Sequence, residues 1–599
     1  MRAAWAVGAI VAVCLGGVLP AGMAQTTITP PIMPLDQVRP GMTGYGLTVL
    51  HGTKIERFAA TILGILRGGP ATDLILFRAS GPVIQESGGT ASGMSGSPIY
   101  VDGRAIGALS FGYHFAGPDA DLSLATPIEE MLKALAPSPG AGTGTMRPRL
   151  YQARAPIATP LGQVDRVILM DSTTDASAYN AGPLPGTVAV APVSVPVVAA
   201  GMTPAALDVL SQTLRRFNIT PRQTYGGRKV FPTPPVEPGS SLGVELVRGD
   251  VEVGAIGTVT YRRGDQLVAF GHPLLNAGAV SVLLTSAWID TIVRSLDFPF
   301  KEGSLGEIVG MATEDRAVGI GGVVGRFPRT FGIRVSVHDT DRGTTQVLGV
   351  QVVRRQDLAE GLVPTAVLSL VQRIMDRVAG GSAKVKLALR ARAIPREIQR
   401  EDLAFDLADI ATASVLDVPA ATQLLFGNFF LDVDPIDMGV DIAVSSKPNT
   451  ALLTGVRVNA HTVHPGDNVE VAVRLRPYGG TTPFSRVVEF TVPDDFPTGP
   501  AFLLVGASGA LNTPAPPAQQ FAQLAAAVGT PPAVGSLDAA IDQFEHSGKN
   551  TEVLIELIPE SVLVAAGSNA NPGFDLQAGT SIPTEWVVLG RFQIPMTVK

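Results

Sequence analysis

The residues of this 599-residue chain that are best suited to chemistry lie in a glycine-flanked serine turn, Gly93–Pro98. Gly93 and Gly96 tolerate the backbone angles that expose the Ser95 hydroxyl and turn successive N–H groups inward. A serine nucleophile needs such a hydroxyl, two fixed donors for the developing oxyanion and a base within reach. We predict Ser95 as nucleophile and the N–H groups of Gly93 and Ser95 as the oxyanion hole. An ordinary turn is the alternative, since Gly-x-Ser-Gly is common in loops.

The residues after this turn predict a strand that binds substrate. Asp102-Gly103 between apolar runs is a signal for a tight hairpin. The second strand of that hairpin ends in four residues, Leu109, Ser110, Phe111 and Gly112. We expect these residues to lie beside Ser95 as a free edge to which an extended peptide can pair.

Several short stretches accompany the serine turn. They are Pro40–Gly46, Gly52–Glu56 and Thr126–Leu132 in the first half, and Glu237–Ser240, Gly257–Thr260 and Ala269–Leu274 further on. Together with Met94–Pro98 they resemble the SpoIVB peptidase family (stage IV sporulation protein B), which are serine peptidases of chymotrypsin-like fold. The resemblance implies a serine endopeptidase of narrow or self-processing specificity, with Ser95 as nucleophile and His272 as general base.

Two features depart from the family's pattern. In the sporulation protein the histidine half precedes the serine half, whereas here His272 follows Ser95, as if the two barrels were permuted. Geometry and not chain order makes a catalytic triad. The second departure is Ser80, which occupies the position of the family's acid. Asp265 and Asp315 are therefore candidates for a third member recruited from elsewhere, with a Ser–His diad or solvated turn aspartates as the alternatives.

The base must be one of seven histidines. For His272 the alternative to a catalytic role is a buried ring bonded to backbone groups beside Pro273. His114, next to the expected substrate strand, is its rival as base or as a ligand contact. The others read as surface side chains: His51, His338, His461, His464 and His546.

Other site classes find no support in the sequence. The chain has no metal-binding, P-loop or dinucleotide motif, so we expect no cofactor and no metal. Gly319–Gly325 reads as a barrel bend. The net charge of −7, without long runs of one sign, gives no basis for a nucleic-acid partner. The single cysteine, Cys14, precedes the expected mature chain, so thiol chemistry and disulfides are excluded there.

The elements that must position these residues are short strands. Gly 66 and Pro 48 against 6% aromatic residues favour many strands joined by turns. We predict a mainly β protein with two chymotrypsin-like barrels, the Ser barrel first and the His barrel second, then a small sandwich and a mixed α/β region. The predicted division is a signal peptide 1–24, the Ser barrel 36–136, a linker 137–150, the His barrel with inserted helices 151–395, a mixed connector 396–450, a β-sandwich 451–512 and a C-terminal region 513–599. Amphipathic helices are expected at Pro204–Leu214 and around Glu401–Ser414.

The start of the chain predicts export. Arg2, an apolar stretch and a small-residue cleavage site before Gln25 are typical of a secretory signal, and Pro20 helps to break the run short of a membrane span. We expect a periplasmic or extracellular protein that acts on a peptide or protein substrate. The rival interpretation is an inactive envelope scaffold or peptide-binding protein of the same fold, with residues 451–599 binding an envelope partner.

Overall fold

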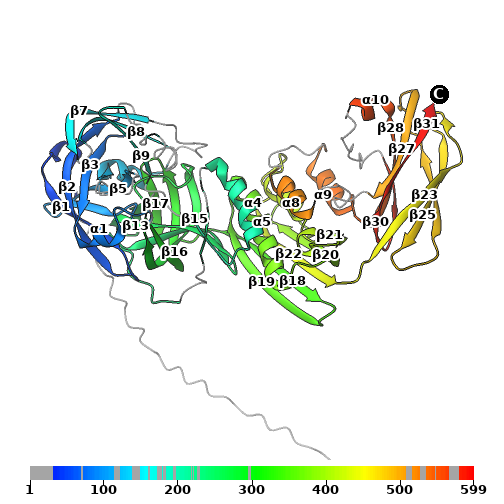
Figure 1. Ribbon diagram of the computed structural model, residues 1–599, viewed down its shortest axis with the longest axis horizontal. Helices are drawn as coiled ribbons and strands as arrows, with labels where there is room; N and C mark the ends of the chain where they lie inside the picture. The colour runs from blue at the N-terminus through cyan, green and yellow to red at the C-terminus, as the bar shows by residue number, and fades with distance from the viewer. Residues whose placement is uncertain are drawn as a thin grey trace, which may run out of the picture.

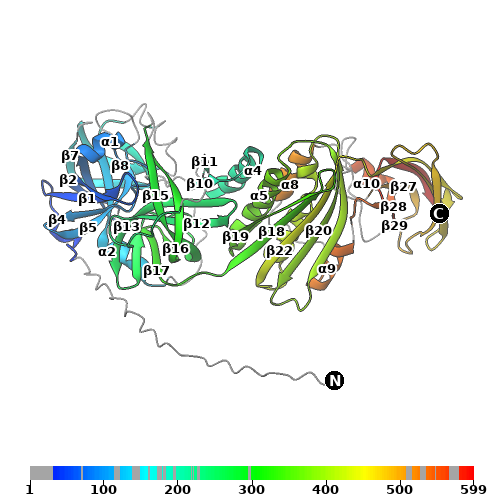
Figure 2. The ribbon, with the colours of Figure 1, turned by 90° about the horizontal axis from the view of Figure 1, so that it is seen from below.

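The protein is mainly β and elongated, with two β-rich units at one end, a helix-covered sheet in the middle and a sandwich at the other end (Figures 1 and 2). This arrangement comes from a computed structural model, and the mainly β prediction is confirmed. The structure describes residues 31–599 except 69–71, 114–121, 138–148, 160–161, 171–178, 180–183, 193–196, 218, 220, 225–229, 295–298, 508–515, 527–533, 547 and 566–578. The predicted signal peptide lies outside the described residues.

The first unit is a nine-stranded sheet that bends back on itself. Its strands, in spatial order, are β1 (Thr43–Val49), β4 (Pro98–Val101), β5 (Arg104–Gly112), β6 (Leu122–Pro127), β3 (Leu74–Ser80), β2 (Ile55–Arg67), β7 (Arg149–Thr159), β8 (Gly162–Leu169) and β9 (Thr187–Pro192). Because β1 also pairs with β2, the strands β1–β6 form a closed hydrogen-bonded circuit, which we name the first ring. Phe58, Ala60 and Ile62 alternate inward along β2 and build its core.

Strands β7–β9 belong to this first sheet, although the sequence pattern assigns residues 151–192 to the second barrel. β7 pairs with the end of β2, and β9 pairs with Phe111 and Gly112 of β5. The reason is long-range: Tyr151, Val167 and Val190 bury against Leu66 and neighbouring side chains in a shared apolar cluster. Periodicity marks these segments as strands without specifying their partners.

The second unit belongs to a 13-stranded sheet. In order, its strands are β11 (Arg222–Thr224), β10 (Val197–Ala200), β13 (Glu252–Arg263), β14 (Gln266–Ala269), β17 (Gly319–Val324), β16 (Phe300–Arg316), β15 (Gly278–Val293), β12 (Ser241–Gly249), β19 (Thr344–Val353), β18 (Thr330–Asp339), β22 (Pro435–Ser445), β20 (Gly381–Ala391) and β21 (Ile398–Asp406). The additional pairing of β12 with β13 closes β12–β17 into a second hydrogen-bonded circuit, the second ring. Gly319–Val324, predicted as a barrel bend, form a strand of this ring.

Beyond the second ring the sheet opens and carries helices on one side (Figures 1 and 2). These helices are α4 (Pro204–Leu214), α5 (Gln356–Met375), α6 (Ile410–Ala413), α7 (Val418–Phe426), α8 (Pro517–Ala526) and α9 (Leu537–His546). The helix predicted at Pro204–Leu214 is confirmed. Among the described residues, α5 alone is long and apolar enough to cross a membrane, and 89% of its apolar window is buried inside the protein, as in a core helix.

The helix predicted around Glu401–Ser414 is wrong, because β21 occupies Ile398–Asp406 and only a short α6 follows. The polar residues that suggest an outer helix face are buried at alternate strand positions. Arg400 is buried against Asp417, at 2.8 Å from Nε to the carboxylate, and Asp402 accepts the N–H of Asn550. Burial raises the pKa of Asp402 to about 7. Charged residues satisfied in this way break the binary pattern on which the prediction depends.

Strands within residues 450–507 and 552–598 contribute to one sandwich core, so strands from both of the predicted C-terminal units share it. One sheet contains β26 (Phe484–Thr491), β25 (Asn468–Pro477), β23 (Thr450–Val458) and β30 (Val587–Leu589). The other contains β24 (Thr462–Val463), β31 (Arg591–Val598), β27 (Gly499–Ala507), β28 (Glu552–Pro559) and β29 (Thr580–Pro583). Three short helices pack against strands: α1 (Pro82–Ser87) and α2 (Ile128–Met131) in the first unit, and α10 (Glu560–Ala565) in the sandwich.

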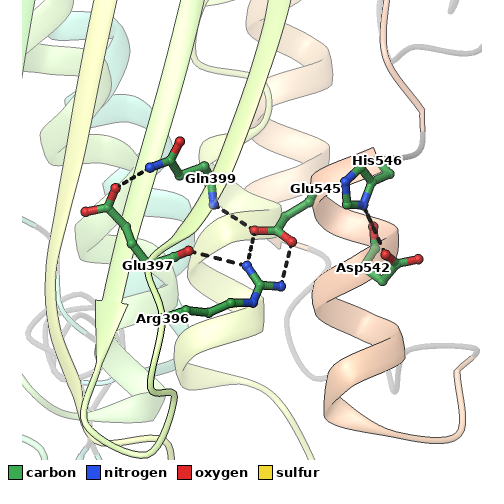
Figure 3. A network of polar contacts seen from close by, with 6 residues as sticks. All are labelled: Arg396, Glu397, Gln399, Asp542, Glu545 and His546. Atoms are coloured by element: carbon green, nitrogen blue, oxygen red, sulfur yellow. Dashed lines mark hydrogen bonds and ion pairs between the residues drawn. The ribbon is translucent and has the colours of Figure 1, made fainter.

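The chain between β27 and β28 leaves the sandwich and returns to the middle unit. Phe521 of α8 and Ile541 of α9 join the core of that unit. Figure 3 shows how α9 is attached: Arg396 donates two hydrogen bonds to Glu545, at 2.6 and 2.7 Å, and the Gln399 N–H adds a third at 2.9 Å. This bidentate pair attaches α9 to the sheet that continues from the second ring.

Candidate active site

The serine turn is held between the two rings. The Ser95 carbonyl accepts the N–H of Thr258 in β13 at 2.9 Å, and the N–H of Gly96 donates to Leu109 in β5 at 2.7 Å. Gly96 has a φ of +88°, and a Cβ there would lie 2.1 Å from the Thr258 carbonyl oxygen and 2.4 Å from the Phe270 nitrogen. Only glycine fits this contact, because the backbones of both rings approach one another at this point.

Ser95 is fully buried, and its Oγ makes no hydrogen bond. The N–H groups of Gly93 and Ser95 likewise donate to no residue in the described part of the chain. An unmade hydrogen bond on a buried polar group costs about 1–3 kcal/mol. This turn therefore contains a buried hydroxyl without a partner and two N–H groups that donate to no described residue. Ser97, two residues further, is also buried with an unbonded Oγ.

His272 lies just after the contact between the rings. Phe270 meets Gly96, and the Gly271 carbonyl accepts a hydrogen bond from Thr126 of the first ring at 2.7 Å. The His272 ring is 2% exposed and stands 6.3 Å from the Phe111 ring centroid. The structure thus brings the two loops together across 177 residues of chain. It does not join their side chains, because Ser95 Oγ has no hydrogen-bond partner.

The His272 ring has its Nδ1 2.8 Å from the Pro273 carbonyl oxygen. A carbonyl oxygen can only accept, so this contact requires a proton on Nδ1. In a Ser-His-Asp triad the acid performs this function for the histidine. Here Nδ1 contacts a backbone carbonyl in place of an acid.

The two candidate acids occupy different places. Asp315 on β16 is buried, and its two carboxylate oxygens accept the N–H groups of Leu274 at 2.9 Å and Leu275 at 2.7 Å. Burial raises the pKa of Asp315 to about 6, while these backbone N–H groups act in the opposite direction. Asp315 therefore shapes the loop that follows His272. Asp265 lies exposed in the β13–β14 hairpin turn, at the far end of β14 from His272.

The prediction that Leu109, Ser110, Phe111 and Gly112 offer a free strand edge is wrong. On one side this part of β5 pairs with β6, from Leu109 opposite Ala125 to Gly112 opposite Ser123. On the other side Leu109 is bonded to the serine turn, and Phe111 and Gly112 pair with β9. The free edge is lost because β9, far away in the sequence, adds to the sheet.

Sequence reasoning missed Lys301, a fully buried lysine whose side chain packs on Gly93. A Cβ on Gly93 would lie 3.1 Å from both Cβ and Cδ of Lys301. Its neighbours Phe300 and Glu302 suggest an ordinary strand with an outward lysine. No local signal marks its burial, which depends on the first ring covering β16.

The remaining histidines do not approach Ser95 by any described contact. His51 pairs with Glu86 at 2.8 Å on the surface, and His338 contacts Thr345. Exposed positions hold the other three described ones: His461, His464 and His546. His114 lies outside the described residues. Within the described ranges no group of three or more His, Cys, Asp or Glu side chains could hold a metal ion.

Comparison with protein families, with curated proteins and with solved structures found no match. The geometry of the serine turn and its neighbours is therefore the basis for a functional proposal.

Proposed function

We propose that this protein is an exported serine endopeptidase with Ser95 as its nucleophile, related to the SpoIVB peptidases with its two barrels permuted. One observation carries the proposal: a buried hydroxyl without a partner shares a turn with the two unbonded N–H groups of Gly93 and Ser95. Two rings of six strands that meet at this turn are consistent with a chymotrypsin-like arrangement.

In the proposed reaction, Ser95 Oγ attacks the carbonyl carbon of a peptide bond while a neighbouring base takes its proton. The carbonyl oxygen becomes an oxyanion and accepts the N–H groups of Gly93 and Ser95. The same base then returns the proton to the leaving amine, and water hydrolyses the acyl-enzyme. His272 is the base that the family resemblance implies. Since Ser95 is fully buried, a substrate must displace a covering segment, which suits narrow or self-directed cleavage.

The rival function is a non-catalytic scaffold that keeps the fold. The complete burial of Ser95 and the missing Ser95–His272 hydrogen bond favour it. The occupied edge at Leu109–Gly112 also removes the simplest way to bind a peptide beside Ser95.

A fluorophosphonate probe distinguishes the two functions, because it phosphonylates only an activated serine. We expect the mature chain, residues 25–599, to be labelled, with the adduct on the peptide that contains Ser95. Ser95→Ala abolishes the label. Ser97→Ala is the matched control, because Ser97 is equally buried and also has an unbonded hydroxyl, and it retains the label. Wild-type protein that stays unlabelled, or a label that survives in Ser95→Ala, would refute the peptidase proposal.

A further inference from the structure

Lys301 is built into the wall of the serine turn. Its N–H donates to the Ser92 carbonyl at 2.9 Å, and the Ser92 N–H donates to the Pro299 carbonyl at 2.8 Å. This bridge lays the aliphatic part of Lys301 along Gly93. Gly93 is two residues from Ser95, and two residues of chain span at most about 7 Å. The aliphatic part of Lys301 and the proposed nucleophile therefore belong to the same small region between the rings.

The amine of Lys301 is enclosed without a neutralising partner among the described residues. The side chain is fully buried, and Nζ bonds to Thr48 Oγ1 of β1 at 3.0 Å. No carboxylate within the described ranges forms an ion pair with it. Removing a lone ammonium from water is costly, and buried lysines respond by losing their proton. Burial alone lowers the pKa of Lys301 to about 7.

The charged groups on the surrounding elements lie elsewhere. β1 and residues 91–97 contain no charged side chain. Glu56, opposite Thr48 on β2, pairs with Lys54 at 2.7 Å. Asp290 on β15 is exposed, and Glu302 follows Lys301 on β16 and therefore projects to the opposite face of that strand. A neutral amine beside the serine turn is thus available near pH 7, when a surface lysine is fully protonated.

We propose that Lys301, and not His272, is the general base for Ser95. This inference rests on the proposed function of Ser95. The reasons are that Ser95 Oγ has no bond to His272, that His272 Nδ1 contacts a backbone carbonyl and not an acid, and that Lys301 lines the same turn. Serine–lysine pairs perform acyl transfer on other folds. The proposal requires that rotation about the side-chain bonds of Lys301 carry Nζ from Thr48 to Ser95.

In this scheme the lone pair of neutral Nζ takes the Ser95 proton as the Oγ–carbon bond forms and the carbonyl electrons move to oxygen. The resulting ammonium donates that proton to the amine nitrogen as the carbon–nitrogen bond breaks. In deacylation Nζ takes a proton from the attacking water and returns it to Ser95 Oγ as the ester bond breaks. His272 is then a positioning residue that fills the space between Phe111 and Phe270.

The test compares rates of fluorophosphonate labelling from pH 5 to pH 10 in the mature chain and in two variants. We expect the wild-type rate to rise with a midpoint near pH 7. Lys301→Met should lower the rate at pH 8 by at least 100-fold, in the range typical for loss of a general base. His272→Gln should lower it less than 10-fold and keep the midpoint. A loss in His272→Gln equal to or larger than the loss in Lys301→Met overturns the proposal and leaves the peptidase function standing.

A third variant guards against misfolding as the cause of the loss. Thr48→Val removes the hydroxyl that binds Nζ and keeps the side-chain size. Because that hydroxyl accepts from the ammonium, its removal should shift the midpoint of labelling below that of the wild type. An unchanged midpoint in Thr48→Val would refute the role of Lys301. If wild-type protein is not labelled at all, the peptidase function fails and this inference fails with it.

Discussion

The free energy of unfolding should depend on pH in the way expected for a buried amine at Lys301. Its pKa falls from an ordinary 10.5 to about 7 on folding. A difference of about 3.5 in pKa, at about 1.36 kcal/mol for each pKa unit, corresponds to a free-energy penalty of about 5 kcal/mol for burying the protonated amine. Between pH 7 and pH 10.5 the unfolded chain holds the proton and the folded chain does not. The free energy of unfolding therefore rises with pH across this window, and the whole penalty is present below pH 7.

Lys301→Met removes this penalty while it keeps a side chain of similar shape. Leaving Thr48 Oγ1 without its partner costs about 1 kcal/mol. At pH 6.5 the variant should therefore be more stable than the wild type by about 4 kcal/mol. At pH 9.5 the advantage should shrink by about 3 kcal/mol, because the folded wild-type chain has lost the proton that the unfolded chain still holds, and the free energy gained by holding that proton falls as the pH rises.

Urea unfolding monitored by tryptophan fluorescence measures this difference in the second ring, which contains Lys301. Trp288 lies on β15 beside β16, and Trp586→Phe makes it the only tryptophan of residues 25–599. Lys133→Met is the control, since Lys133 is 60% exposed and pairs with Glu130, and it should give no pH-dependent difference. The reasoning is refuted if Lys301→Met is less stable than wild type at pH 6.5, or if the difference in stability does not change with pH. Either result would show that a partner compensates the amine of Lys301.

Three further substitutions test other contacts. Gly96→Ala should abolish probe labelling and destabilise the protein by more than 3 kcal/mol, as labelling and thermal unfolding will measure. Gly103→Ala is the control, because Gly103 is also in the left-handed region (φ +72°) but a Cβ there would meet no atom within 4 Å. It should cost only about 1–2 kcal/mol and keep the label. Asp315→Ala should destabilise the protein by about 3 kcal/mol, because two buried N–H groups lose their acceptor; an unchanged melting temperature would contradict this role. Glu545→Gln should accelerate hydrogen exchange in α9 at least tenfold, and equal exchange in Glu545→Gln and in the exposed control Asp542→Asn would refute the proposed attachment.

Local features of the chain were readable because they are encoded by neighbouring residues. Alternating apolar residues predict strands, and the glycines around Ser95 predict a turn with left-handed backbone angles; both are present. The Pro204–Leu214 helix was recognised for the same reason, from its proline in the first turn and its apolar stripe.

Charged residues at buried positions misled the same local reasoning. Arg400 and Asp402 are typical of an exposed helix face in the sequence, yet both are buried in β21. There Arg400 forms ion pairs with Asp402 and Asp417. The burial of Lys301 has the same origin, because a lysine on a strand gives no sign of which element will cover it. Burial of a charge depends on partners and neighbours that are distant in the sequence.

The amino-acid sequence by itself determined the mainly β class, the shape of the serine turn and the residues that it contains, since backbone angles and alternation are properties of adjacent residues. Only the tertiary structure decided that the edge after Ser95 is occupied by β9, that Gly96 meets Phe270, and that Lys301 lies against Gly93. Each of these depends on segments some 80 to 210 residues apart closing into two sheets. That pairing is selected by burial of the combined apolar surface, which no single stretch of sequence contains.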